Sequence, residues 1–196
     1  MSGAKRLGFT KSSTHPRCYC ISIVGPQETL AVRIELRIKE PPTMQPLTRS
    51  YDPHEDDVRS ILTDICRQMG QRSEFVVSGF GQDRWPVDVQ TDLPVFLEQL
   101  PEILRAVHEI TVAEIDFYEQ GIERSIALSP DNGSYVAVCR SRTNWQPSPS
   151  IERIEYADLE KMLLATREVF MRAFKETAPG LAMHPWVRRW LEGGAH

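Results

Sequence analysis

Long apolar runs are missing from this sequence of 196 residues, and no secretory signal is evident in it. Its longest apolar runs are only a few residues, whereas a helix that crosses a bilayer needs roughly 20. The basic residues near the amino terminus are not followed by the apolar segment of a signal peptide. We therefore expect a cytoplasmic protein that does not enter a membrane.

Cysteine is too scarce and too irregularly spaced for a disulfide scaffold in a chain of this size. The four cysteines are Cys18, Cys20, Cys66 and Cys139. We predict that they act as small buried hydrophobes, which is the commonest use of free cysteine. A zinc site built on His15, Cys18 and Cys20 has no apparent fourth ligand, and both of its cysteines fall on one face of a predicted strand.

Signatures of catalysis are also missing, since the chain has no Gly-rich phosphate loop, nucleophile elbow or HExxH sequence. Residues 54–57 include ligand-type side chains. Carboxylates at the start of a helix are, however, explained by the helix dipole without any metal. We expect no catalytic residue, no metal and no cofactor.

The net charge of -4 is unevenly distributed along the chain. Residues 1–50 hold eight Lys or Arg against three Asp or Glu, giving +5, whereas residues 51–100 hold four against ten, giving -6. Residues 101–150 hold four against seven, giving -3, and the remainder is neutral. Nucleic-acid binding depends on clustered Lys and Arg, so the acidic middle argues against it. A basic protein partner fits this charge, although ordinary solubilising charge is the simpler alternative.

The segment from Glu109 to Arg142 predicts a three-stranded antiparallel meander with turns at Gln120-Gly121 and Asn132-Gly133. Two-residue primed turns need positive φ, which Asn and Gly adopt readily. The turns fix the register and place one set of side chains on the core face. The core rows are Ile115/Ile126/Cys139 and Ala113/Leu128/Ala137, with Phe117 opposite Arg124. The other face carries Glu114, Asp116 and Arg140, with Tyr118 near the turn.

The other elements follow from hydrophobic periodicity and from helix-capping residues. Strands are predicted at residues 17–24 and 29–39, which would form a hairpin, and at 74–80 and 151–155. Helices are predicted from Asp52-Pro53 to about Met69, from residue 91 or 92 to 107 with a kink or break at Pro101, and at 158–177 and 185–191.

Together these elements predict a single α+β domain over residues 1–196. Its antiparallel sheet would combine the N-terminal hairpin with the three-stranded meander and pack against three to four helices. Residues 1–14 are expected to form a flexible arm.

Two tryptophans lie among turn-forming residues, Trp85 in residues 81–86 and Trp145 in residues 144–147. Each ring has two possible positions. It can pack into the core beneath its loop, or it can stand exposed among acidic residues, as the aromatic anchors of protein interfaces do.

Two stretches, from Trp85-Pro86 to Asp92-Leu93 and from Phe117 to Arg124, resemble segments of uncharacterised bacterial proteins. The size, acidity and lack of catalytic signature are similar to those of immunity proteins of bacterial toxin systems. The resemblance covers the region from Gly79 onward. It implies a protein that binds and blocks a cognate toxin domain, often through an acidic surface. Because immunity proteins have diverse folds and share no common motif, it assigns no role to any residue.

We expect a non-enzymatic binding protein that masks the functional surface of a basic protein partner. Buried aromatic area and carboxylate pairing would hold the partner, through Asp83, Trp85, Asp88, Asp116, Glu123 and Trp145.

Two alternatives stay open. The first is a small-ligand binder or enzyme that uses Glu114, Asp116, Tyr118 and Arg140, because neighbouring carboxylates shift each other's pKa. The second is a component of a homo-oligomer, with the strand at residues 29–39 or the helix that carries Trp186 and Trp190 as the contact.

Overall fold

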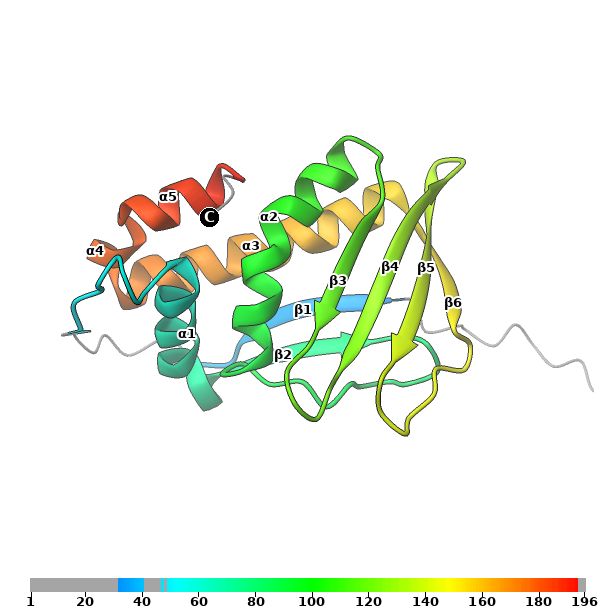
Figure 1. Ribbon diagram of the computed structural model, residues 1–196, viewed down its shortest axis with the longest axis horizontal. Coiled ribbons are helices and arrows are strands. Elements are labelled where there is room, and N and C mark those ends of the chain that lie inside the picture. Colours follow the sequence, from blue (N-terminus) through cyan, green and yellow to red (C-terminus); the bar gives the residue numbers. More distant parts are fainter. Residues whose placement is uncertain (1–31, 41–46, 48, 194–196) are drawn as a thin grey trace, which may run out of the picture.

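The computed structural model describes residues 32–40, 47 and 49–193, which fold into an α+β structure with two antiparallel sheets (Figure 1). In chain order the elements are β1 (Arg33–Ile38), α1 (Val58–Met69), a 3-10 turn (Gly70–Arg72), β2 (Ser73–Ser78), α2 (Asp92–His108), β3 (Ala113–Phe117), β4 (Arg124–Asp131), β5 (Ser134–Ser141), β6 (Ile151–Glu155), α3 (Tyr156–Thr177), α4 (Pro179–Ala182) and α5 (Pro185–Leu191). None of these helices is both long and apolar enough to cross a membrane.

The four-stranded sheet has the order β3-β4-β5-β6, and its first three strands confirm the predicted meander register. Ile115 pairs with Ile126, which pairs with Cys139, and Phe117 pairs with Arg124. At the second turn, Asn132 and Gly133 have φ of +48° and +86°, as a primed turn requires. The first connection is longer than two residues, since β3 ends at Phe117 and β4 begins at Arg124, but the register is unchanged. The predicted strand at residues 151–155 joins the sheet as β6.

The second sheet contains β1 and β2 alone within the described residues, paired antiparallel from Arg33 with Ser78 to Ile38 with Ser73. The sequence predicted both strands but not their pairing. The other half of the expected N-terminal hairpin, residues 17–24, lies outside the described residues, as do the expected arm at residues 1–14 and two of the cysteines. Cys66 and Cys139 are free and buried, as predicted.

Helix α1 begins later than predicted. The side chain of Asp52 accepts from the backbone N–H of His54 at 2.9 Å, and its carbonyl accepts from the N–H groups of Glu55 and Asp56, so the Asp52-Pro53 signal forms a turn. Asp57 is the actual N-cap. The helix then starts at the first buried apolar side chain, because packing of an apolar face rather than capping alone stabilises a helix.

Helix α2 continues through Pro101, so of the predicted kink or break, the break is wrong. Proline lacks the N–H that would bond the carbonyl four residues earlier, which here belongs to Leu97. The indole N–H of Trp190 in α5 donates to this carbonyl at 2.8 Å. A tertiary hydrogen bond therefore satisfies the carbonyl that proline leaves free.

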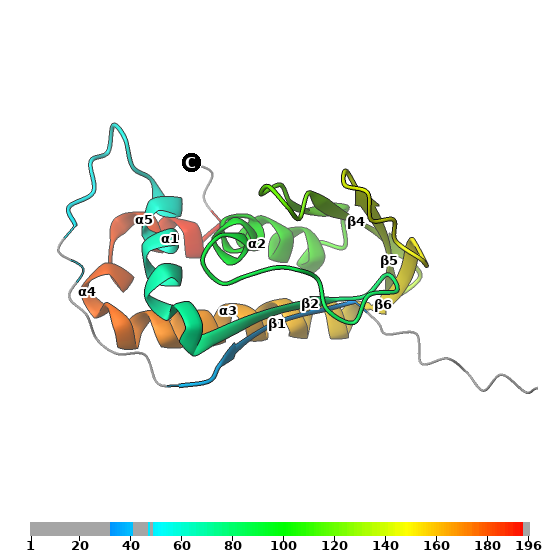
Figure 2. The same cartoon turned by 90° about the horizontal axis from the view of Figure 1, so that it is seen from below.

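Buried apolar side chains from both sheets and the helices form one cluster. Phe75 of β2 lies at its centre, with ring centroids 5.6 Å from Phe96 of α2 and 6.3 Å from Phe117 of β3. Figure 2 shows β1, β2 and α3 along one side of the molecule and α2 and β4 on the opposite side. The core thus separates two outward-facing layers.

Two glycines at positive φ differ in their surroundings and provide a matched pair of variants. A Cβ on Gly81 (φ +80°) would lie 1.8 Å from the carbonyl oxygen of Ser148, whereas one on Gly121 (φ +101°) meets nothing within 4 Å. We expect Gly121→Ala to cost about 1 kcal/mol of backbone strain, and Gly81→Ala to cost about 2 kcal/mol more because of overpacking. Urea unfolding measures both losses. Equal losses would contradict the close packing of residues 79–82 on the loop at 142–150.

Candidate functional site

Both loop tryptophans lie against one buried arginine, Arg124, which is 4% exposed at the start of β4. The Cζ atom of Arg124 is 3.6 Å from the ring centroid of Trp145 and 4.9 Å from that of Trp85. Its Nη1 donates to Oε1 of Gln82 at 2.6 Å. Trp85 is only 1% exposed, so the expectation that it contacts a partner is corrected. It is a core residue.

Arg124 is a structural residue that the sequence reasoning did not single out. The predicted register already placed it opposite Phe117 on the core face, and a charged residue in a core row was the available signal. Within the described part of the chain, Arg124 has no carboxylate ion pair and its Nε has no hydrogen-bond partner. Burial lowers its pKa, but a guanidinium stays charged in proteins. The two indole faces therefore provide its main electrostatic compensation.

Trp145 fixes the loop that follows β5. Its ring is half-buried against Arg124 and lies 6.0 Å from the ring of Trp85 in an edge-on arrangement. Further along the same loop, the N–H of Ser148 donates to the carbonyl of Phe80 at 3.0 Å. The exposed part of the Trp145 ring stays available to a partner.

Asp116 pairs with Arg142 at 2.7 Å rather than with Arg140, the arginine that the predicted register placed on the same face of the sheet. Ser125 lies between Asp116 and Arg140 in the sheet, which separates them by two strand spacings, or roughly 10 Å. Arg142 lies beyond the end of β5, where its N–H donates to the carbonyl of Glu123 at 2.9 Å. This bond brings Arg142 beside the β3–β4 connection and within reach of Asp116.

The remaining predicted contact residues lie in different settings. Asp88 has a structural role, because its carboxylate accepts from the N–H of Gln90 at 2.6 Å and from the N–H and hydroxyl of Thr91 at 2.8 Å. Asp83 is exposed and Glu123 half-buried. Neither forms an ion pair with any described residue. The six residues therefore do not form one contiguous site.

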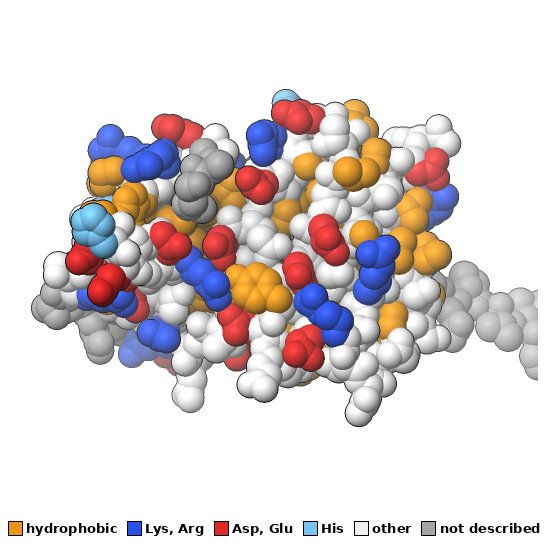
Figure 3. All heavy atoms as spheres, viewed as in Figure 1, with side chains coloured by type: hydrophobic (Ala, Val, Ile, Leu, Met, Phe, Trp, Pro, Cys, Tyr) orange, Lys and Arg blue, Asp and Glu red, His pale blue; other side chains and the backbone are white. Residues whose placement is uncertain are grey.

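The structure instead reveals an acidic surface formed by α2, β3 and the residues that follow each of them (Figure 3). Three guanidinium groups, on Arg59, Arg105 and Arg142, lie among its six carboxylates, so its formal charge is -3. We call this surface the α2–β3 acidic face. Its carboxylates are Glu98, Glu102, Glu109, Glu114, Asp116 and Glu119.

A groove of about 440 Å³ runs between α2 and β3 and is lined by Glu102, Glu109 and Glu114. The amide of Gln99 holds its two walls together, accepting from the N–H of Asp116 and donating to its carbonyl, both at 2.9 Å. Glu109 and Glu114 have no ion-pair partner in the described part of the chain. Two carboxylates at this groove are therefore free to meet cations from outside.

Two exposed aliphatic side chains lie where α2 connects to β3, and one of them, Val112, lines the groove. Ile110 is 59% exposed and Val112 is 70% exposed. Ile110 also has a φ of +53°, a left-handed conformation that costs a β-branched residue roughly 1–2 kcal/mol. A left-handed residue commonly follows the last residue of a helix, and here the N–H of Thr111 closes the end of α2 by donating to the carbonyl of Ala106 at 2.8 Å.

Tyr118 stands exposed near the opposite end of the acidic face. Its hydroxyl donates to Oε2 of Glu98 at 3.3 Å, and the Cζ of Arg59 lies 5.3 Å from its ring centroid. Arg59 also pairs with Glu119 at 2.8 Å. These contacts from α1 and α2 hold the ring in a fixed position.

The residues of the alternative ligand or catalytic site do not converge. Glu114 lines the groove, Asp116 pairs with Arg142, and Tyr118 bonds Glu98. Among the described residues, no three His, Cys, Asp or Glu side chains are grouped as metal ligands would be.

Comparisons of the chain with protein-family models, curated proteins and solved structures gave no match. The resemblance to immunity proteins therefore stays a prediction, neither supported nor opposed by these comparisons.

Asp92 lies beneath the acidic face, and its burial can be tested by measuring stability as a function of pH. It is buried, and its Oδ2 accepts from the N–H of Asp88 at 2.8 Å. Burial, with smaller effects of Asp88 and Glu119, raises the pKa of Asp92 from 3.8 to about 6. The folded protein therefore binds this proton more tightly than the unfolded chain, and stability is lost as pH rises from about 4 through 6.

We expect Asp92→Asn to remove this loss, since the amide keeps an acceptor but does not titrate. The stability of the variant relative to wild type should rise by about 2–3 kcal/mol between pH 4 and pH 7.5. Urea unfolding at several pH values measures the difference, and subtracting wild type cancels the other titrating groups. A difference independent of pH would show that Asp92 is not buried as described.

Proposed function

We propose that this protein is a non-enzymatic binding protein whose α2–β3 acidic face docks on a basic protein partner. The observation that carries the proposal is a groove that holds two carboxylates without an ion pair among the described residues, Glu109 and Glu114, and that the exposed Val112 also lines. Ile110, which is exposed as well, is the next residue after Glu109. Exposed apolar side chains gain from burial at about 25 cal/mol per Å². Free carboxylates can pair with an incoming cation without first breaking an internal ion pair.

The two kinds of group have different roles in the proposed complex. Ile110 and Val112 supply the apolar contact, and the fixed ring of Tyr118 supplies an aromatic one. The surrounding carboxylates raise the rate of encounter with a basic surface and exclude acidic proteins. Asp116 belongs to this face. Arg142 pairs with the carboxylate of Asp116 and donates its backbone N–H to the carbonyl of Glu123, which brings these residues close together. We therefore keep Asp116 and Glu123 as contact residues.

We further propose that the partner is a toxin domain and that binding inhibits it by masking its functional surface. This part rests on the resemblance to immunity proteins and on the acidic surface that such a role commonly uses. The proposed inhibition is steric and electrostatic, with no covalent step. Trp145 extends the contact if the partner reaches the loop after β5.

A pull-down from native lysate with wild type and the Glu109→Lys/Glu114→Lys variant tests the acidic face. A stoichiometric basic protein should be retained by wild type and weakened about tenfold or more in the variant, because like charges then meet at the interface. Glu176→Lys, an exposed reversal on α3, is the control and should bind as wild type does. Quantitative mass spectrometry of the retained protein gives the ratio.

The Val112→Ser variant tests the apolar contact separately from the charges of the acidic face. It leaves every charge in place, so we expect faster dissociation of the same partner with little change in salt dependence. A partner retained equally by wild type and by both groove variants would contradict docking through this face. Retention that is lost only in Trp145→Ala would move the contact to the β5–β6 loop.

A further inference from the structure

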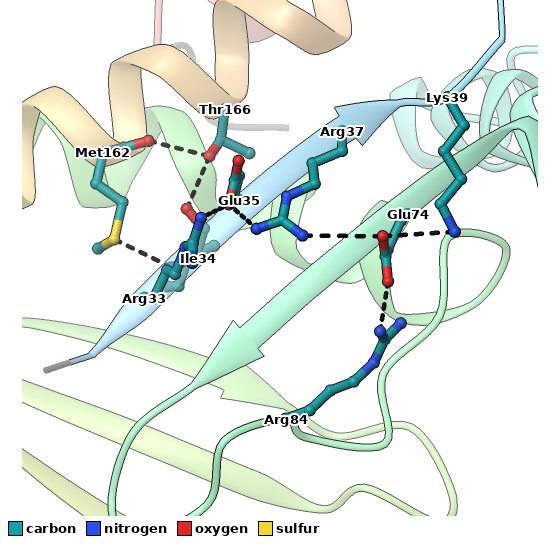
Figure 4. A network of polar contacts seen from close by, with 9 residues as sticks. All are labelled: Arg33, Ile34, Glu35, Arg37, Lys39, Glu74, Arg84, Met162 and Thr166. Atoms are coloured by element: carbon teal, nitrogen blue, oxygen red, sulfur yellow. Dashed lines mark hydrogen bonds and ion pairs between the residues drawn. The ribbon is translucent and has the colours of Figure 1, made fainter. Parts of the chain in front are cut away.

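The outer surface of the β1–β2 sheet carries a second charged network, of opposite sign to the acidic face (Figure 4). Side chains alternate along each strand, so Ile34 and Leu36 of β1 enter the core, while Arg33, Glu35 and Arg37 face outward. On β2, Glu74 lies opposite Arg37. Lys39 and Arg84 reach the same network from the ends of the neighbouring loops.

Two carboxylates hold four cations in this network. Glu35 bonds Arg33 and Arg37, the latter at 2.9 Å. Glu74 pairs with Arg84, with Lys39 at 3.4 Å and with Arg37 at 3.9 Å. The formal charge of these six side chains is therefore +2. We call this surface the β1–β2 cationic face.

The cations of this face lie outside the carboxylates. The exposed fractions of the four cationic side chains run from 41% to 59%, against 35% for Glu35 and 13% for Glu74. A molecule approaching the sheet therefore meets guanidinium and ammonium groups first. Because the carboxylates already fix these groups, little side-chain entropy is lost when they bind an anionic surface.

Helix α3 limits the way in which this sheet can associate. The N–H of Ile34 donates to Sδ of Met162 at 3.0 Å, and the hydroxyl of Thr166 donates to the carbonyl of Ile34 at 3.2 Å (Figure 4). These bonds occupy the backbone groups of Ile34 that a further strand would use. Association through the charged face is therefore favoured over strand addition at this point.

We infer that the β1–β2 cationic face binds the α2–β3 acidic face of a second copy of this chain. The two faces have charges of +2 and -3 and lie on opposite sides of the core that contains Phe75. Because they are different surfaces, the contact is heterologous and runs head to tail. A single chain cannot bring its own two faces together, because they lie on opposite sides of the molecule. An open assembly of any size therefore has one free cationic face and one free acidic face.

Self-association and binding of a basic partner would then use the same acidic face and compete for it. The inference does not rest on the proposed function, since it concerns the purified chain alone. A basic partner that never appears would leave the self-association measurement unaffected.

The test uses two purified double variants that neutralise one face each. Arg37→Gln/Arg84→Gln removes two cations from the cationic face, and Glu109→Gln/Glu114→Gln removes both free carboxylates from the acidic face. Sedimentation velocity over a concentration series at low and at moderate salt gives the mass of each species. The control, Lys175→Gln/Glu176→Gln, neutralises two exposed residues near the end of α3, and thermal unfolding verifies that every variant is folded.

Wild type and the α3 control should self-associate, more weakly as salt increases because screening reduces the attraction. Each face variant alone should associate at least tenfold more weakly. An equimolar mixture of the two face variants should form a heterodimer and nothing larger, since only one intact pair of faces remains. Wild type that stays monomeric throughout, or a mixture that stays monomeric, would overturn the inference.

Discussion

The buried guanidinium of Arg124 is the constraint on which the packing of the β2–α2 and β5–β6 loops depends. Removing a charge from water is costly unless the protein replaces its hydration. Here the replacement comes from Gln82 and from the rings of Trp85 and Trp145, which belong to two loops distant in sequence. The charge is compensated only when the β2–α2 loop, the start of β4 and the β5–β6 loop are all in place. Arg124 therefore orders the loops beside which Arg142 reaches Asp116.

A second buried acidic group links the two sheets, which share no strand pairing within the described residues. The carboxylate of Glu152 on β6 accepts from the N–H of Phe80, just beyond β2. Space there requires glycine, since a Cβ on Gly79 would lie 3.0 Å from Oε2 of Glu152 and 3.1 Å from Cα of Val32. Burial raises the pKa of Glu152, so this connection carries an energetic cost. Such buried polar groups are more readily explained by the geometry that they specify than by net stabilisation.

Local chemistry made much of the fold predictable, and long-range contacts account for the errors. Asn132 and Gly133 encode a turn, and the turn alone determines the pairing of β4 with β5. The partner of β1 is more than thirty residues away, and no local signal selects it. Pro101 predicted a kink or a break in the helix because a sequence does not show that Trp190 will donate to the carbonyl of Leu97. Trp85 had two possible positions for the same reason, since its neighbours Phe117 and Arg124 are distant in the sequence.

The acidic face was predictable in sign but not in composition. The acidic charge of residues 51–150 follows from counting, and Asp116 was correctly placed on an open sheet face. Ile110 and Val112 gave no such signal, because single aliphatic residues in a connecting segment can be either buried or exposed. Their exposure depends on the left-handed turn at Ile110, which neither periodicity nor propensity indicates. Sequence patterns identify the residues that should be buried, whereas the exposure of Ile110 and Val112, on the surface that we propose binds a partner, is a departure from the pattern.

The net charge of -4 conceals a division of charge between two sides of the molecule. On the β1–β2 cationic face, carboxylates lie beneath the cations and fix them. On the α2–β3 acidic face, arginines fix some carboxylates while Glu109 and Glu114 stay unpaired. Each face thus has internal ion pairs, which hold its side chains in place. Each face also has an excess of charge of one sign, which would attract a surface of the opposite charge. Because ion pairs at a surface add little stability, this arrangement is better explained by recognition than by folding.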